Sequence, residues 1–165
     1  MVHLGAIDHG GEDTIPPMSP SAAERLVVLT MRGLALTFAV VGVLFIATPD
    51  GVIGTIDDVG DWFGSFSPGP KSDEKMWLGL AFAYMTVITG IAWLVSTDVV
   101  RYRPLLLVLA AGKTASSLST GAFFFFHDDV FIYFLNFIVD GSLVGTSLLC
   151  WSLAGRVEAE ARAPV

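Results

Sequence analysis

Four long runs of hydrophobic residues dominate the chain, and the segments between them collect most of the charged residues. The runs extend over residues 26–47, 76–95, 105–126 and 130–154. Crossing the hydrocarbon core as a helix takes about 20 mostly apolar residues, and each run has that length. Because lipid offers the backbone no hydrogen-bonding partner, such runs cross as helices. The pattern predicts an all-α membrane protein with four transmembrane helices.

Signals at the ends of these runs predict where the helices begin and end. Ser21 followed by Glu24 has the pattern of a capping box, and Pro104 suits the first turn of the third helix. We expect Asp128-Asp129 to cap the start of the fourth helix and Gly155 to end it. The chain then divides into a flexible acidic N-terminal tail, a transmembrane domain and a C-terminal tail: residues 1–23, 24–155 and 156–165.

The first connection between spans is long and acidic, whereas the other two are short. Within it, residues 52–66 mix aromatic and aliphatic side chains with carboxylates. Two interpretations are open: a short amphipathic helix in the membrane interface, or a loosely ordered loop. The short connections at 98–103 and 127–129 favour antiparallel neighbours, which gives an up-down four-helix bundle.

The distribution of Lys and Arg predicts the orientation in the membrane, because basic residues near the spans mark the cytoplasmic side. If there are four crossings, one side receives Arg25, Arg101, Arg103, Arg156 and Arg162. The opposite side has only Lys71 and Lys75. We expect an integral protein of a prokaryotic plasma membrane, with the N- and C-termini in the cytoplasm.

Composition agrees with a membrane protein and narrows the chemistry. The 165 residues are 53% hydrophobic and 15% charged, against about 25% charged in soluble domains. The net charge of −7 opposes nucleic-acid binding, which favours a basic surface. The single cysteine, Cys150, lies in an apolar run as a packing residue, and no histidine lies within a span. We therefore expect no disulfide and no metal site.

The most informative residues are three charges within the apolar runs: Arg32, Lys113 and Asp140. An intramembrane charge is costly and usually faces the bundle interior with a partner. Counted from the turn near Asp128 at about 1.5 Å per residue, Lys113 and Asp140 differ in level by roughly 4–5 Å. A lysine side chain can span that distance, so we predict an ion pair or a shared-proton pair. For Arg32, snorkelling to the headgroups and a role in the interior are both open.

Small polar residues accompany these charges. Spacings of three and four residues put Lys113 and Ser117 on one helix face, and Asn136 and Asp140 on another. A polar interior of this kind either joins helices by hydrogen bonds or forms a small cavity that binds a ligand or relays protons. The candidate residues for the second use are Arg32, Tyr84, Lys113, Ser117, Asn136 and Asp140. Since no nucleophile–base constellation is visible, we assign no catalytic residue.

Four short motifs lie in or beside the spans: Arg32-Gly33-Leu34, Thr48-Pro49-Asp50, Leu78-Gly79-Leu80 and Arg101-Tyr102-Arg103-Pro104. In these motifs the chain resembles the DoxX-like family of small four-helix membrane proteins, over residues 25–154. The acidic segment 51–70 departs from a compact member as an insertion. One branch of that family is similar to a subunit of thiosulfate:quinone oxidoreductase. The resemblance implies a four-helix membrane fold and transfers no catalytic residue.

These features favour a non-catalytic accessory or assembly subunit of a membrane complex. We expect it to require no cofactor and to be able to bind a quinone or a lipid. Its expected partners are the lipid bilayer and either other membrane proteins or further copies of itself, and not nucleic acid. The alternative is a proton- or ion-coupled transporter, or a membrane enzyme, centred on Lys113 and Asp140.

Overall fold

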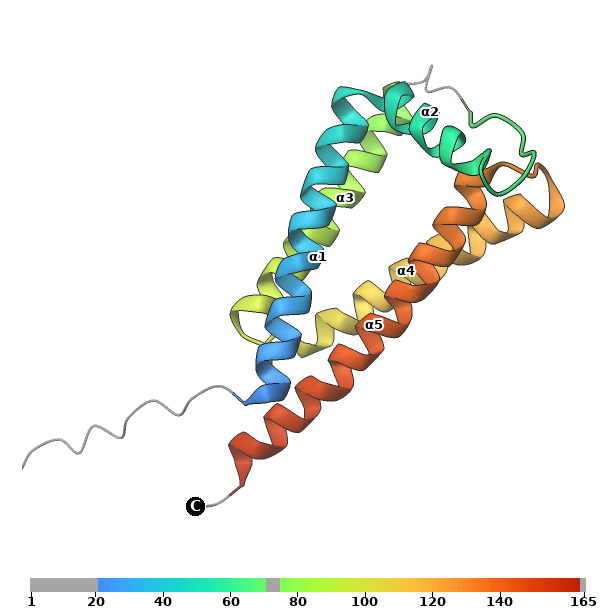
Figure 1. Cartoon of the computed structure of the whole chain (residues 1–165). Helices are drawn as coiled ribbons and strands as arrows, with labels where there is room; N and C mark the ends of the chain where they lie inside the picture. Colours follow the sequence, from blue (N-terminus) through green and yellow to red (C-terminus); the bar gives the residue numbers. More distant parts are fainter. Residues whose placement is uncertain (1–20, 71–74, 164–165) are drawn as a thin grey trace, which may run out of the picture.

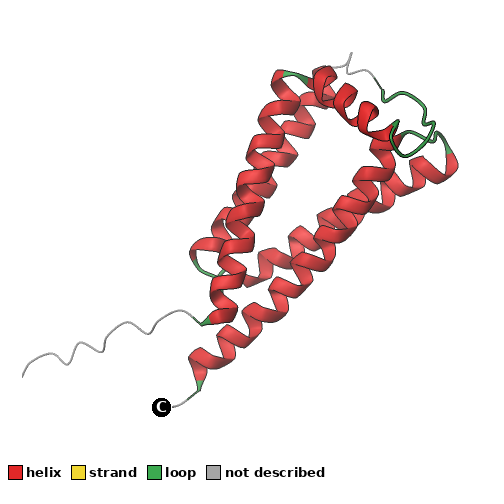
Figure 2. Cartoon of the chain, in the orientation of Figure 1, coloured by secondary structure: helices red, strands yellow, loops and turns green. Residues whose placement is uncertain are grey.

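The structure is a computed structural model that describes residues 21–70 and 75–163. These ranges contain helices and loops without a β-strand, as Figure 2 shows. The helices are α1 (Ala22–Ala47), α2 (Pro49–Gly60), α3 (Lys75–Thr97), α4 (Arg103–Phe126) and α5 (Phe131–Arg162). Within the described residues, α1, α3, α4 and α5 are long and apolar enough to cross a membrane. The predicted all-α fold with four candidate transmembrane helices is confirmed.

The four long helices form two closely packed pairs, α1 with α3 and α4 with α5. In Figure 1 the pairs converge at the end that holds the start of α1 and the end of α5, and they diverge toward the other end. There α2 lies across the gap and contacts both α1 and α5. The short 98–103 connection does not make α3 and α4 a closely packed pair, since α3 contacts α1 far more extensively.

Glycines allow the close approach within each pair. A Cβ atom on Gly42 of α1 would lie 3.0 Å from the Met85 Cβ of α3. A Cβ atom on Gly121 of α4 would lie 2.7 Å from the Phe137 ring of α5. Small residues at such positions let helix backbones approach and gain van der Waals contact in a membrane, where apolar surface alone does not drive association. The two pairs are therefore tighter than the contact between them.

The acidic first connection contains a helix. The helical interpretation of residues 52–66 is confirmed as far as Gly60, whereas residues 61–66 form turns and loop. The aromatic residues Trp62 and Phe63 come after the helix and are 81% and 74% exposed. Next, the loop attaches to the α4–α5 turn, where the Ser67 hydroxyl donates to the Asp129 carboxylate at 2.7 Å. The Phe66 ring lies 5.1 Å, centroid to centroid, from that of Phe131. This segment is held against the end of the α4–α5 pair.

Two predicted helix ends are confirmed. The Ser21 hydroxyl accepts a hydrogen bond from the Glu24 backbone N–H at 3.3 Å. Pro104 lies in the first turn of α4. The predicted cap of α5 by Asp128-Asp129 is wrong: Val130 is the N-cap residue and no side chain caps it. The Asp129 carboxylate is instead engaged by the 60–70 loop.

The prediction that Gly155 ends the last helix is also wrong, because α5 continues to Arg162. Gly155 serves a close approach: a Cβ atom there would lie 2.7 Å from the Arg103 guanidinium. That guanidinium lies 4.4 Å from the centre of the Trp151 ring and bonds Glu158 at 2.8 Å. These contacts stabilise the helix beyond Gly155, so most of the expected C-terminal tail is helical. Of the expected N-terminal tail, residues 1–20 lie outside the described part, and α1 already begins at Ala22.

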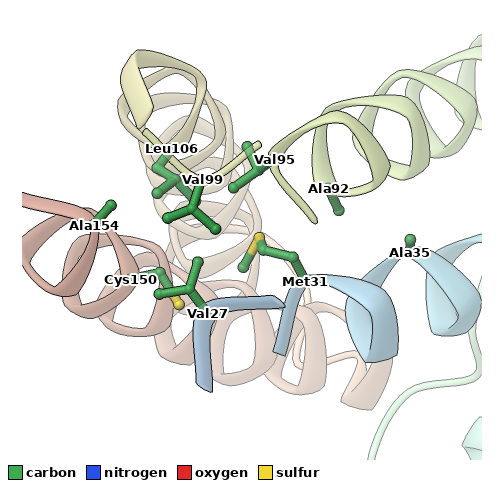
Figure 3. Close-up of a cluster of buried hydrophobic side chains, with 9 residues drawn as sticks. All are labelled: Val27, Met31, Ala35, Ala92, Val95, Val99, Leu106, Cys150 and Ala154. Atoms are coloured by element: carbon green, nitrogen blue, oxygen red, sulfur yellow. The ribbon is translucent and has the colours of Figure 1, made fainter. Parts of the chain in front are cut away.

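A hydrophobic core holds the pairs together at the end where they converge (Figure 3). Its buried side chains come from all four long helices and the α3–α4 turn: Val27, Met31, Ala35, Ala92, Val95, Val99, Leu106, Cys150 and Ala154. Cys150 is a packing residue here, as expected. A second cluster of Phe38, Ile88 and Leu109 follows along the helices. This second cluster leads directly to the charged residues.

Candidate functional site: a buried ion pair between the helix pairs

Lys113 of α4 and Asp140 of α5 form a buried ion pair. The distance from the Lys113 Nζ to the Asp140 Oδ1 is 2.8 Å. The two side chains are only 1% and 4% exposed. The prediction of this pair from the residue count is confirmed. Because two charges are costly to remove from water, such a pair persists only with close geometry and further hydrogen bonds.

Aromatic rings of the other helix pair cover the Lys113 ammonium. The Nζ atom lies 4.2 Å from the centre of the Phe38 ring of α1 and 5.3 Å from that of the Tyr84 ring of α3. A cation within about 6 Å of a ring centre is attracted to the negative face of the ring. The ion pair thus brings together side chains from all four long helices, and it attaches the α4–α5 pair to the α1–α3 pair.

Hydrogen bonds extend this polar centre along the α4–α5 interface. The Asn136 Nδ2 lies 3.4 Å from the second carboxylate oxygen of Asp140 and 3.2 Å from the Thr120 hydroxyl. The Ser117 hydroxyl donates to the Phe137 carbonyl oxygen at 2.8 Å. The Asn136 bond satisfies Asp140 beyond its contact with the ammonium, which is the condition for a stable buried charge.

The structure therefore brings together five of the six candidate residues: Tyr84, Lys113, Ser117, Asn136 and Asp140. Arg32 is not among them. It is exposed on α1 and lines a groove with Glu24, Arg25, Val28, Leu29 and Ser96. The role of Arg32 in the interior is therefore not supported, and snorkelling to the headgroups remains a prediction.

Sequence reasoning missed Phe38, whose ring is the nearer of the two over Lys113. A phenylalanine in an apolar run carries no polar signal. The available signal is the spacing of Met31, Ala35 and Phe38, which are all buried on one face of α1. That face points to the bundle interior, but lipid-facing stripes in the same helix are equally apolar, so the pattern alone does not single it out.

A further polar group lies deeper in the interior. Ser147 of α5 is 0% exposed, and its hydroxyl has no hydrogen-bond partner among the described residues. It lies seven residues from Asp140, about two helical turns, on a similar helix face. Buried hydroxyls without a protein partner commonly bond an internal water when space allows. The polar centre can therefore extend toward the converging end of the bundle.

The chemistry of this centre is that of a closed, charge-compensated polar network. It can hold a proton between Lys113 and Asp140, and it can fix the relative position of four helices. In the two described ranges, no group of three His, Cys, Asp or Glu side chains could hold a metal ion. Comparison with protein-family models, with curated proteins and with solved structures found no match. The fold defines the class: a helical protein with four helices able to cross a membrane.

Proposed function

We propose that this chain is a DoxX-like integral membrane protein that acts as a non-catalytic accessory or assembly subunit of a membrane complex. The observation that carries the proposal is the ion pair. Lys113 and Asp140 compensate each other, are shielded from the surface and join the four long helices. The charges thus belong to the packed interior of the bundle rather than present themselves to a substrate. The outer surfaces of the helices remain for lipid, quinone or a protein partner.

In this proposal the long helices cross the membrane up and down, with both termini in the cytoplasm. The start of α1, the α3–α4 turn and the end of α5 lie at the same converging end of the molecule (Figure 1). That end carries Arg25, Arg101 and Arg156, in keeping with the positive-inside rule. At the opposite end α2 lies in the interface, where the exposed Trp62 and Phe63 rings suit the headgroup region.

The partner docks on the outer face of the last turn of α2 and the segment after it. Asp58 and Asp61 are exposed there beside Trp62 and Phe63. Aromatic side chains supply much of the binding energy in protein interfaces, and rim charges supply orientation and specificity. A membrane protein with basic residues on its outer surface fits this face.

The test is purification of the tagged full chain from its native membrane in mild detergent, followed by native mass spectrometry. We expect a complex of fixed stoichiometry that is lost in the Asp58→Asn/Asp61→Asn/Trp62→Ala variant. Glu160→Gln, an exposed acid at the other end of the molecule, is the matched control and keeps the complex. A lone monomer that carries neither protein nor lipid would overturn the proposal.

A second candidate is a proton- or ion-coupled transporter or membrane enzyme centred on Lys113 and Asp140. Two observations favour it. The Ser147 hydroxyl, two turns from Asp140, has no hydrogen-bond partner among the described residues. The Tyr84 ring, whose centre lies 5.3 Å from the Lys113 Nζ atom, is 36% exposed. It predicts that Asp140→Asn abolishes proton flux into proteoliposomes although the fold survives. If the Lys113→Met/Asp140→Asn protein stays folded and keeps its full flux, this candidate fails.

A further inference from the structure

A groove of about 340 Å³ lies at the converging end of the bundle, away from the ion pair. One wall is formed by successive turns of α1 and the other by the end of α3. The lining residues are Glu24, Arg25, Val28, Leu29, Arg32 and Ser96. Two cationic side chains, one acidic side chain and an apolar strip therefore share one open groove.

The two arginines of this groove are available to a ligand. Arg25 and Arg32 are both exposed, and neither guanidinium group has a hydrogen bond or ion pair with any residue in 21–70 or 75–163. They are seven residues apart, so they lie on one face of α1, separated by about 10 Å along the helix axis. Both guanidinium groups can reach a single anionic group when the side chain of Arg32, which lies farther into the apolar run, extends toward the start of α1.

The position of Arg32 favours an anionic ligand in a membrane. It lies six residues inside the apolar run that begins at Leu26, where an uncompensated charge is costly. The other two charges within the spans, Lys113 and Asp140, compensate each other at 2.8 Å. No described residue does this for Arg32, which leaves its guanidinium free to pair with an anionic head group.

The rest of the groove fits an amphiphile better than a soluble anion. Val28 and Leu29 lie between the two arginines along α1, and the Leu29 side chain is 67% exposed. The Ser96 hydroxyl donates to the Trp93 carbonyl oxygen at 2.7 Å and still offers its own oxygen as an acceptor. An anionic head at the arginines and an apolar chain along Val28 and Leu29 would satisfy both parts of the lining.

We propose that this groove binds an anionic phospholipid of the adjacent leaflet, with its phosphate held between Arg25 and Arg32 and the start of an acyl chain on Val28 and Leu29. Arginine matches the planar, multi-oxygen geometry of phosphate through paired N–H donors. The Glu24 carboxylate, at the outer end of the groove, repels a second negative charge on the ligand. The groove therefore favours a head group that carries one negative charge. The inference rests on the membrane orientation in the proposed function and not on the accessory role.

The experiment uses the purified full chain in mild detergent with defined lipid mixtures. Phosphatidylglycerol and phosphatidylcholine of identical acyl chains compete, and native mass spectrometry measures the ratio of bound lipids. We expect the wild type to retain phosphatidylglycerol preferentially. Arg25→Gln/Arg32→Gln lowers this preference about 30-fold, or about fivefold for each arginine, as expected for one basic contact apiece. Glu24→Gln raises it.

A matched control removes the same charge at the same end of the molecule but outside the groove. Arg101→Gln/Arg156→Gln changes two exposed arginines and should leave the preference within about twofold, since diffuse charge is screened over a Debye length. Equal losses in both double variants would mean general surface attraction and would overturn the groove site. An unchanged preference in the Arg25→Gln/Arg32→Gln protein overturns it as well.

The source of the phosphate is tested by adding soluble glycerol phosphate. Displacement of phosphatidylglycerol at matching concentrations would show that a free phosphate compound is the ligand and would overturn the lipid assignment. Circular dichroism checks the fold of each variant, and if the double variant does not fold, the two single variants carry the test through their fivefold effects. The outcome is independent of the accessory role, because no protein partner is present in the assay.

Discussion

Neutralising Asp140 should lower the free energy of unfolding far more than the small change in the shape of the side chain suggests. Asp140→Asn keeps the size of the side chain and an oxygen for the Asn136 amide, but it leaves the Lys113 ammonium without its counterion. The pair is closed at 2.8 Å, with side-chain exposures of 1% and 4%, so solvent cannot replace the lost charge. Removing one partner of a buried ion pair costs about 3–5 kcal/mol. The cation–π contacts of Lys113 exist before and after the change and do not offset it.

The double variant separates the charge from the packing. Lys113→Met/Asp140→Asn removes both charges while keeping side chains of similar volume, so no buried charge remains uncompensated. Replacing a buried pair by neutral groups is often neutral or stabilising. We expect each single variant to lose about 3–5 kcal/mol and the double variant to stay within about 1 kcal/mol of the wild type. The two sites are therefore strongly coupled, as expected for residues in direct contact.

The assay is the free energy of unfolding in mild detergent, titrated with a denaturing detergent and followed by circular dichroism. Asp58→Asn makes the same chemical change at an exposed position and should alter the free energy by less than about 0.5 kcal/mol. If the two single variants each cost less than about 1 kcal/mol, the Lys113–Asp140 ion pair does not hold the two helix pairs together. If their effects simply add in the double variant, the contact itself contributes nothing.

Four further variants test the packing of the helices. Gly121→Ala should cost about 1–3 kcal/mol of unfolding free energy by overpacking a ring 2.7 Å away, whereas Gly145→Ala, with nothing within 4 Å, should gain up to about 1 kcal/mol. Phe38→Leu should cost about 2 kcal/mol through lost core packing and lost ring contact with Lys113, and the cost should fall by about 1 kcal/mol in the Lys113→Met/Asp140→Asn background, where only the packing part remains. Arg103→Gln should speed amide hydrogen exchange in residues 156–162, with little change in the spans; unchanged exchange would refute its role in extending α5.

The sequence was sufficient for the spans and for one tertiary contact, and the reason is geometric. Lys113 and Asp140 lie on helices joined by one short turn, so residue counting gives both depths from a common origin. Phe38 belongs to a helix with no short connection to α4, and no common origin relates its depth to that of Lys113. The prediction that Gly155 ends the helix was wrong because glycine serves two uses: it ends helices, and it lets another group approach closely. Only the position of Arg103 distinguishes these uses.

The pairing of the helices explains why the polar centre matters for the architecture. Glycine-mediated packing makes α1–α3 and α4–α5 tight units, and the Lys113–Asp140 ion pair adds a contact within α4–α5. Between the units, the larger hydrophobic core acts at the converging end, α2 acts at the opposite end, and the cluster of Phe38, Ile88 and Leu109 lies between them. The cation–π contacts of Lys113 join the units between these two levels. Loss of Asp140 should therefore loosen the middle of the molecule before either end, and amide exchange should rise first around Phe38 and Tyr84.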